Sequence, residues 1–307
     1  MNTEKIPEKL KDFRNFLYYV WHSLEQIKRD PTPIQYDIAG FMQNGPKRGV
    51  IQGFRGVGKS WICSAFVVHQ LLLDPAKNIL VVSASKTRAD DFSTFTLRLL
   101  HELPLLEHLK PKNDQRFSKV SFDVGPAQLT GSRADIIIAD DIEVPTNSAT
   151  QTMRDKLSEQ IKEFDAILKP EDGSKILFLG TPQCEDSAYR KLGERGYNLK
   201  VWPSESITEK VNTGVYGGSV SSLCIAEKAG EPTEPTRFSE FDLNERKISY
   251  GSAGYALQFM LNTALSDVDR FPLKLGNIIV HDIDNDLGPE KLVWAQSPDL
   301  EWTNLPC

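Results

Sequence analysis

A glycine-rich segment, set between a strand-like run and a helical pattern, limits the possible folds of this chain more than any other feature. Residues 53–60 read Gly-Phe-Arg-Gly-Val-Gly-Lys-Ser and match G-x-x-x-x-G-K-[ST] at every fixed position. The strand-like run Val50–Gln52 precedes the segment, and helical spacing follows over Trp61–Leu73. A strand before this pattern and a helix after it form the context in which it binds phosphate. The segment therefore predicts a P-loop in an α/β sheet.

The first two hundred residues alternate short apolar runs with helical spacing. We expect strands at 49–52, 79–83, 119–124, 134–139, 175–179 and 199–202, and helices at 13–28, 34–43, 59–73, 87–103 and 150–168. Apolar strands that alternate with helices are typical of a parallel sheet covered on both faces. The predicted fold class is α/β, a P-loop NTPase of the ASCE/RecA-like type with a mainly parallel sheet flanked by helices.

The alternation ends at about residue 203. Residues 211–236 are rich in Gly, Ser, Thr and Pro, which predicts a mobile loop or linker. Helical spacing returns over 241–262, with interruptions at Gly251 and Gly254. We expect three parts, namely an ATPase core over 1–203, a small and mostly helical lid or linker subdomain over 204–265, and an acidic tail over 266–307.

The glycine-rich segment predicts how a nucleotide is held. Glycines let successive backbone N–H groups converge on phosphate oxygens, and the N-terminus of the following helix adds partial positive charge. Lys59 is expected to pair with the β- and γ-phosphates of ATP, and the Ser60 hydroxyl to ligate Mg²⁺. The Arg55 guanidinium either reaches the γ-phosphate or points to solvent, and we favour the first. The predicted nucleotide-binding residues here are Gly53, Phe54, Arg55, Gly56, Val57, Gly58, Lys59, Ser60 and Trp61.

An acidic strand end supplies the carboxylates that phosphoryl transfer needs. The apolar run 134–139 ends at Asp140, which we expect to lie beside the Mg²⁺ held by Ser60. A further carboxylate must orient the attacking water, and Asp141 and Glu143 compete for that role. Glu143 has the longer side chain and, by strand alternation, faces the same way as Asp141. We favour Glu143 by a small margin.

Two polar residues at other strand ends complete the predicted site. Gln35 lies before the first strand and close to two prolines, where it reads the adenine edge or is simply a surface residue of a helix. Thr181 follows the strand 175–179, where its hydroxyl could sense the γ-phosphate and signal its loss to the rest of the protein.

Charge and hydropathy exclude several kinds of partner. The net charge is −6, although residues 1–60 hold ten Lys and Arg against six Asp and Glu, and residues 204–307 hold eight against sixteen. A passive DNA-coating protein would present a strong basic field, so a transient, local grip on a polyanion is the remaining option. No apolar run approaches the roughly 18 residues that span a bilayer, so we expect no membrane partner. The four cysteines lack disulfide or metal spacing, which favours a reducing cytoplasm.

Five separated blocks of the sequence resemble one known family, and they occur in the same order as in that family. The blocks GFRGVGKSWICSAFVV, ILVVSASKTRADDF, LTGSRADIIIADDIE, FLGTPQ and GYALQFMLN are similar to the large terminase subunit (DNA maturase B) of short-tailed bacteriophages, over about residues 21–275. The resemblance implies an ATP-driven motor that threads double-stranded DNA through a portal into a procapsid. It also implies that Arg55 lies in the Walker A loop, that Gln35 belongs to the adenine motif and that Asp140 is the Walker B aspartate. Thr181 would belong to the coupling motif.

The same resemblance implies partners in the cytoplasm of the host cell. They are double-stranded DNA, the portal and procapsid, the small terminase subunit and further copies of the chain in a ring on the portal. In such rings an arginine of one subunit contacts the nucleotide of the next. Arg133 is our candidate for that arginine, with a local salt bridge as the alternative.

The chain departs from the family in two places. The family's RNase H-like nuclease would begin near the end of this chain, so we expect ATP hydrolysis without DNA cleavage. The acidic stretch 281–286 lacks the Gly and Glu of a calcium loop, so we expect no metal there. Relatives also carry a longer loop where this chain has 124–129.

Two other functions share the P-loop. A helicase or translocase unrelated to packaging would need a second RecA-like domain, and no further strand and helix alternation follows residue 203. A small-molecule kinase would need a basic lid, whereas the segment after 203 is acidic.

Overall fold

The computed structural model arranges the described residues around one parallel sheet. It describes residues 6–24, 27, 29–110, 133–184 and 186–263, together with the backbone of 120–121. The chain divides into two compact units, Met1–Asp267 and Val268–Cys307, and every described residue lies in the first. The predicted acidic tail and the departure at 124–129 therefore fall outside the described residues.

Six strands form the sheet among the described residues, in the order β3-β2-β4-β5-β1-β6. Their bounds are Arg48–Gly53 (β1), Ile79–Ser83 (β2), Val120–Ser121 (β3), Ile136–Asp140 (β4), Lys175–Gly180 (β5) and Asn198–Trp202 (β6). Every neighbouring pair is parallel. The strand before the P-loop and the strand that ends at Asp140 both pair with β5, so their carboxyl ends share one edge of the sheet. The predicted α/β class is confirmed.

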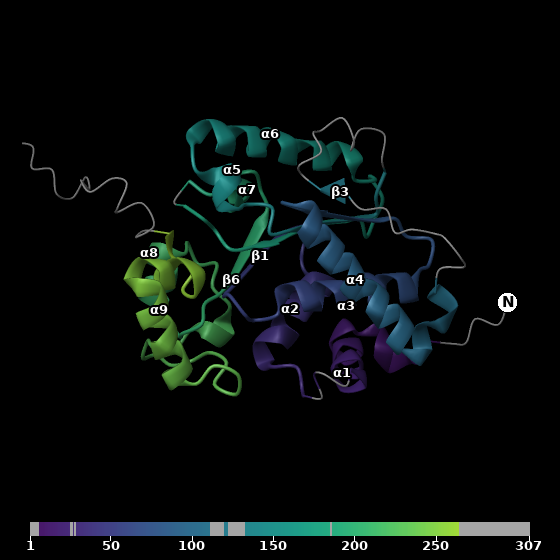
Figure 1. Ribbon diagram of the computed structural model, residues 1–307, viewed down its shortest axis with the longest axis horizontal. Helices are drawn as coiled ribbons and strands as arrows, with labels where there is room; N and C mark the ends of the chain where they lie inside the picture. Colours follow the sequence, from purple (N-terminus) through teal and green to yellow (C-terminus); the bar gives the residue numbers. More distant parts are fainter. Residues whose placement is uncertain are drawn as a thin grey trace, which may run out of the picture. The chain divides into compact units, whose positions relative to one another are not determined.

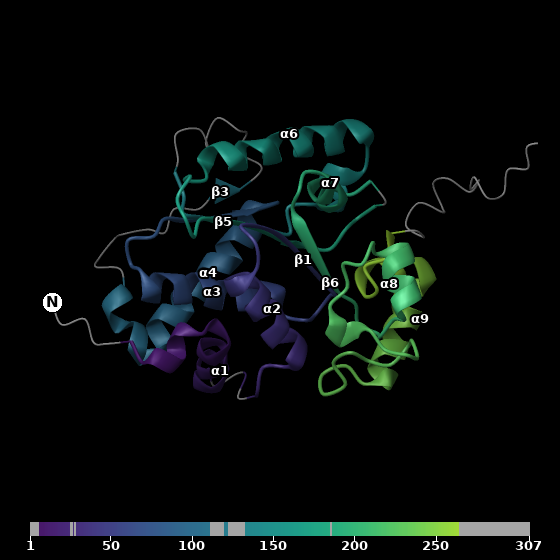
Figure 2. The same ribbon diagram turned by 180° about the vertical axis from the view of Figure 1, so that it is seen from behind.

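Helices cover both faces of the sheet, as Figures 1 and 2 show. One face carries α1 (Phe13–Ser23), α2 (Pro33–Asn44), α3 (Lys59–Leu73) and α4 (Lys86–Glu102), and the other carries α6 (Gln151–Ile167) and α7 (Ala188–Glu194). Shorter elements are η1 (Glu8–Lys11), η2 (Pro104–Leu109) and α5 (Pro145–Ser148).

Strand alternation divides the core into these two layers. On β1, Ile51 packs with the α1–α4 side while Val50 packs with the α6 and α7 side, and on β5 Leu177 and Phe178 divide in the same way. Both faces of the central strands are therefore apolar and buried, as expected of a covered parallel sheet.

Helix boundaries follow local capping. Thr32 caps α2 through a capping box with Gln35, and Pro33 occupies the first turn, where its missing N–H costs nothing. The helix α1 ends at Ser23 rather than at residue 28 as predicted, because Leu24 adopts an extended backbone and buries its side chain. The prediction of this helix end was wrong.

The segment after β6 is more ordered than its composition suggests. It contains α8 (Glu209–Val215), η4 (Ser222–Cys224) and α9 (Glu240–Gln258). Val220 forms a parallel bridge with Val201 of β6, and Cys224 is buried, so the segment 211–236, which we predicted as a mobile loop or linker, packs against β6 instead. Within α9, Gly251 has φ of 66° and interrupts the helix. None of the helices in the described part of the chain is long and apolar enough to cross a membrane.

Candidate nucleotide-binding site

The P-loop folds back on itself between β1 and α3. Gly56 and Gly58 both have φ of 96°, in the left-handed region that favours glycine, and Gly58 is the N-cap of α3. The Lys59 ammonium donates to the carbonyl oxygen of Gly53 at 2.6 Å and lies 3.4 Å from that of Phe54. The ammonium therefore lies against the start of the loop.

Burial lowers the pKa of Lys59, and the nearby carboxylates of Asp141 and Asp140 oppose that shift. The Lys59 side chain is partly buried, and its ammonium donates to neutral carbonyl groups rather than directly to a carboxylate. A phosphate in the loop would supply a counter-charge, because it would bind the same ammonium as a charge-assisted hydrogen bond.

The N–H groups of the loop divide into two sets. Those of Phe54, Arg55 and Val57 donate to protein oxygens, at 3.0 Å to Trp202, 2.9 Å to Gln258 and 3.3 Å to Phe54 respectively. The first N–H groups of α3, at Lys59 and Ser60, have no intrahelical acceptor. Fewer backbone N–H groups of the motif are therefore available to bind phosphate than the sequence predicts. Phe54 and Val57 are fully buried, so their side chains support the loop from behind.

Ser60 and Asp140 meet as predicted for a magnesium site. The Ser60 hydroxyl donates to Oδ1 of Asp140 at 3.3 Å. Burial, followed by the nearby Asp141, raises the pKa of Asp140 to about 7, while Ser60 and Lys59 lower it. Carboxylate and hydroxyl oxygens are hard ligands that suit Mg²⁺, which takes few protein ligands when substrate phosphates supply the rest. The described residues contain no cluster of three or more His, Cys, Asp or Glu that could hold a metal.

Asp141 has an unusual backbone and one ionic partner. Its φ is 49°, and its carboxylate accepts from Nη1 of Arg88 at 2.8 Å. Because β4 ends at Asp140, strand alternation does not extend to residue 143 and does not set the direction in which Glu143 faces, contrary to our expectation. Both Asp141 and Glu143 nevertheless line the same cavity.

Glu143 is held by three donors. Its Oε1 accepts from the Gln183 N–H at 2.7 Å, and its Oε2 accepts from the Ser187 hydroxyl at 2.8 Å and from the Ala188 N–H at 2.6 Å. Burial raises the pKa of Glu143, and these hydrogen bonds oppose the shift. The carboxylate is therefore fixed in direction and linked to the segment that follows β5.

Gln35 and Thr181 also line the cavity. Gln35 is buried and is not a surface residue, because its Nε2 donates to the Val57 carbonyl at 2.9 Å while its Oε1 accepts from the Thr32 N–H at 3.2 Å. Its role toward adenine stays a prediction. Thr181 is buried directly after β5, two residues before Gln183.

The two predicted arginines lie in different places. Arg55 lines the cavity and contacts Oε1 of Gln258, at the end of α9, at 3.4 Å. Arg133 is exposed, donates to the carbonyl oxygen of Ala166 and is not among the residues that line the cavity. Trp61 lines it with its ring stacked on Phe95 at 4.7 Å.

The cavity has a volume of about 1510 Å³ and includes residues that sequence reasoning missed. Arg237, from the segment before α9, contacts the P-loop, and Arg88, at the start of α4, holds Asp141. Neither carries a sequence signal, since Arg237 follows a Pro-rich stretch and Arg88 lies on an ordinary amphipathic helix. Only the fold brings them to the loop.

Two comparisons with known proteins find similarity to the same kind of phage protein. The family model "Terminase large subunit, T4likevirus-type, N-terminal" matches residues 50–180. The large terminase subunit of Enterobacteria phage T3 is 44% identical over 96% of this chain and 54% of its own length. The chain therefore spans about half the length of that relative.

Two solved structures are more distant. The ATPase domain of the Thermus phage P74-26 large terminase has a TM-score of 0.46 and 16% identity, covering 81% of this chain and 97% of that domain. The HK97 bacteriophage large terminase has a TM-score of 0.48 and 11% identity, covering 84% of this chain and 55% of its own. The family-model match and the 44% identity make this chain similar to part of the large terminase subunits of phages, and its fold places the Ser60 hydroxyl of the P-loop against Asp140.

Proposed function

We propose that the chain hydrolyses ATP with Mg²⁺ and that hydrolysis drives double-stranded DNA through a portal into a procapsid. The observation that carries the proposal is the meeting of Lys59, Ser60 and Asp140 at one sheet edge, where the Ser60 hydroxyl donates to the Asp140 carboxylate at 3.3 Å. This arrangement fits phosphoryl transfer, in which positioning and charge stabilisation supply most of the catalysis. The 44% identity to a phage large terminase subunit favours packaging over other uses of ATP.

Each residue of the site has a proposed role. Lys59 binds the β- and γ-phosphates, while Ser60 and Asp140 hold Mg²⁺, which neutralises charge on the phosphates when bound. Glu143 orients the attacking water, and Asp141 is the alternative. Burial and three fixed donors favour Glu143, because a carboxylate held in one direction needs little reorganisation during the reaction.

The segment after β5 is proposed to report the state of the phosphates. Thr181 lines the cavity, and the Gln183 N–H donates directly to Glu143. A shift of this segment would therefore move the carboxylate that orients water. The contact supports a coupling role for Thr181 and its neighbours.

Arginines complete the proposed machinery. Arg55 lies at the cavity and is proposed to contact the γ-phosphate after leaving Gln258. Arg133 is exposed and is proposed to act on the nucleotide of a neighbouring copy in a ring, which would require it to leave the Ala166 carbonyl. The portal and procapsid, the small terminase subunit and the cytoplasm of the host are the proposed setting.

A turnover assay tests the proposal. The chain is assayed for ATP hydrolysis with and without double-stranded DNA and portal-bearing procapsids, and DNA uptake is measured as protection from nuclease. Lys59→Ala should reduce turnover by about 10²-fold or more. The matched change Lys156→Ala, at an exposed position of α6, should leave it unchanged. Strand separation without any procapsid effect would favour a helicase, and phosphate transfer to a metabolite would refute the proposal.

A further inference from the structure

An arginine from the segment before α9 contacts two carbonyl groups of the P-loop. Arg237 donates from Nη2 to the oxygen of Gly56 at 2.9 Å and from Nη1 to the oxygen of Val57 at 3.1 Å. The same Val57 oxygen accepts from Nε2 of Gln35 at 2.9 Å. Donors from outside the loop therefore hold two successive loop carbonyls.

These contacts fix the direction of the next N–H group. In a trans peptide the N–H points opposite to the C=O of the same unit, and the described residues contain no cis peptide. Holding the Val57 oxygen toward Arg237 and Gln35 turns the Gly58 N–H to the opposite side, at the N-terminus of α3. Helix N-termini are where phosphate groups bind, and a cation beside the carbonyl also polarises the peptide and strengthens its N–H as a donor.

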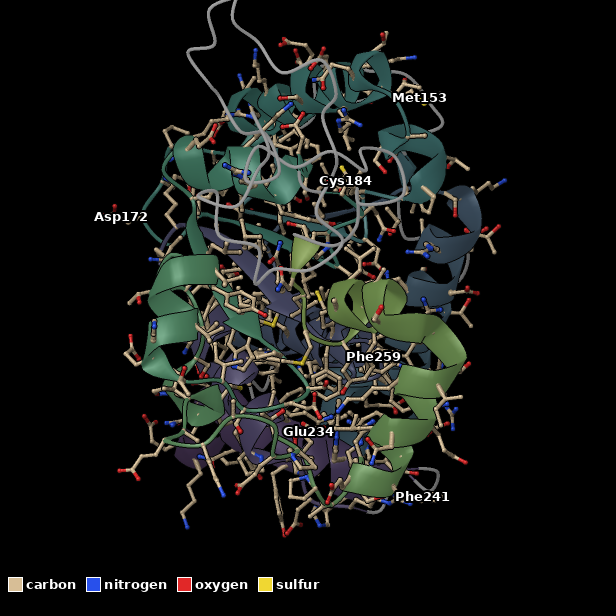
Figure 3. All side chains as sticks on the ribbon, turned by 90° about the vertical axis from the view of Figure 1, so that its left-hand side faces the viewer. Met153, Asp172, Cys184, Glu234, Phe241 and Phe259 are labelled. Atoms are coloured by element: carbon tan, nitrogen blue, oxygen red, sulfur yellow. The ribbon has the colours of Figure 1, made fainter. Side chains whose placement is uncertain are left out.

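A buried carboxylate holds Arg237 in place. Glu234 is 1% exposed, its Oε2 lies 3.5 Å from Nη1 of Arg237, and its Oε1 accepts from the Thr32 hydroxyl. Thr32 is the N-cap of α2, the helix that carries Gln35. Figure 3 labels Glu234 near the purple ribbon of the first helices. One hydrogen-bond network therefore joins the start of α2, the P-loop and the segment before α9.

The segment does not depend on Arg237 alone for its place. The ring of Phe238 packs edge-on against Phe54, with centroids 5.2 Å apart. It also lies so close to the loop that a Cβ on Gly56 would come within 2.8 Å of its Cζ. Loss of the guanidinium leaves this contact in place, so an effect on nucleotide binding would report the carbonyl contacts rather than undocking.

We propose that Arg237, held by Glu234, is a positioning residue that fixes the Gly56 and Val57 carbonyls and so presents the Gly58 N–H to the phosphates of the nucleotide. The inference rests on the proposed function, because it assumes that the P-loop binds ATP. It makes nucleotide affinity depend on a residue 180 positions away from Val57 in the sequence. The loop motif by itself then forms only part of the phosphate site.

The test is Arg237→Met in the 307-residue chain. Titration calorimetry gives the affinities for ATP and ADP, and thermal unfolding without nucleotide reports stability. We expect about tenfold weaker binding, within the usual range of coupling between two sites. KM for ATP should rise by the same factor while kcat changes by less than about twofold, because the loop contacts phosphate in the ground state and the transition state alike. A merely structural role would lower stability without this split.

Matched variants complete the test. Arg246→Met, at an exposed position of α9, should bind nucleotide as the wild type does. Arg237→Lys retains the charge but has one donor nitrogen in place of Nη1 and Nη2, so it should recover part of the affinity. Wild-type affinity in folded Arg237→Met overturns the inference.

If Arg237→Met does not fold, Arg237→Lys and Glu234→Gln decide the question. Weaker binding in both supports the inference, and unchanged binding in both overturns it. If the wild-type chain binds no nucleotide, the proposed function itself fails and the inference falls with it. That outcome is distinct from a variant that binds as tightly as the wild type.

Discussion

Glu143→Gln is expected to lower stability as well as hydrolysis. The carboxylate shares two oxygens among three donors, whereas a glutamine amide offers one oxygen and an NH₂ group. Either the Gln183 N–H or the Ala188 N–H would then face a donor. A hydrogen bond to a charged group contributes about 1.5–3 kcal/mol to the free energy of unfolding. The neutral amide no longer has to be buried as a charge, which offsets part of the stability lost with that hydrogen bond. We expect the free energy of unfolding to fall by about 2 kcal/mol.

A loss of this size has a measurable thermal signature. It corresponds to a decrease in Tm of about 4–8 °C for a domain of this size. The control Glu159→Gln changes a 70% exposed side chain that forms an ion pair with Lys162 on the same helix. Its effect on the free energy of unfolding should stay below about 1 kcal/mol. Urea unfolding followed by circular dichroism measures both variants.

The same preparations separate the two candidate carboxylates. With ATP binding retained, Glu143→Gln should reduce hydrolysis by about 10²–10⁴-fold, the usual contribution of a group that assists proton transfer. Asp141→Asn removes a partly exposed ion pair with Arg88 and should leave stability nearly unchanged. Unchanged stability in Glu143→Gln would refute the hydrogen-bond argument. Hydrolysis lost in Asp141→Asn and kept in Glu143→Gln would assign the role to Asp141.

Three further outcomes can be measured on the same protein. Mg²⁺-dependent nucleotide affinity, followed by calorimetry, should rise with pH through about 7, because the Asp140 carboxyl must ionise to ligate the metal, and Asp140→Asn should flatten this profile. Burial lowers the pKa of His69 to about 4, so the unfolded state binds more protons and urea-measured stability should fall by up to about 3 kcal/mol between pH 6.5 and 4. Gly180→Ala should lower Tm, because its Cβ would lie 1.9 Å from the buried Tyr189 hydroxyl, whereas Gly193→Ala, with open space in α7, should raise it slightly.

Local patterns predicted most of the fold. The helix at 59–73 and the strand at 79–83 match the structure residue for residue, because their apolar spacing and flanking turns are local properties. The end of α1 was mispredicted, since Leu24 leaves the helix to bury its side chain in a core that the sequence does not display. The segment 211–236 was mispredicted for a similar reason. Its Gly and Ser residues read as a loop, yet contacts with β6 order it.

The residues of the site show the same distinction between what local sequence predicts and what only tertiary contacts bring together. Lys59, Ser60 and Asp140 follow from motif chemistry, because a P-loop and an apolar strand that ends in a carboxylate have few ways to meet in a parallel sheet. The partners of Glu143 could not be predicted from the sequence. Glu143 follows β4, whereas the Gln183 and Ala188 N–H groups that donate to it follow β5.

The sequence by itself predicted the α/β fold, the glycine-rich loop that ends at Lys59 and Ser60, and the strand that ends at Asp140, because each pattern lies in residues close together in the chain. Only the tertiary structure decided which groups hold the loop. Arg237 reaches the Val57 carbonyl from 180 positions away, and Glu234 meets Thr32 from 202. Such contacts arise when separate segments pack around the sheet, and the geometry of that packing is not written in any local pattern.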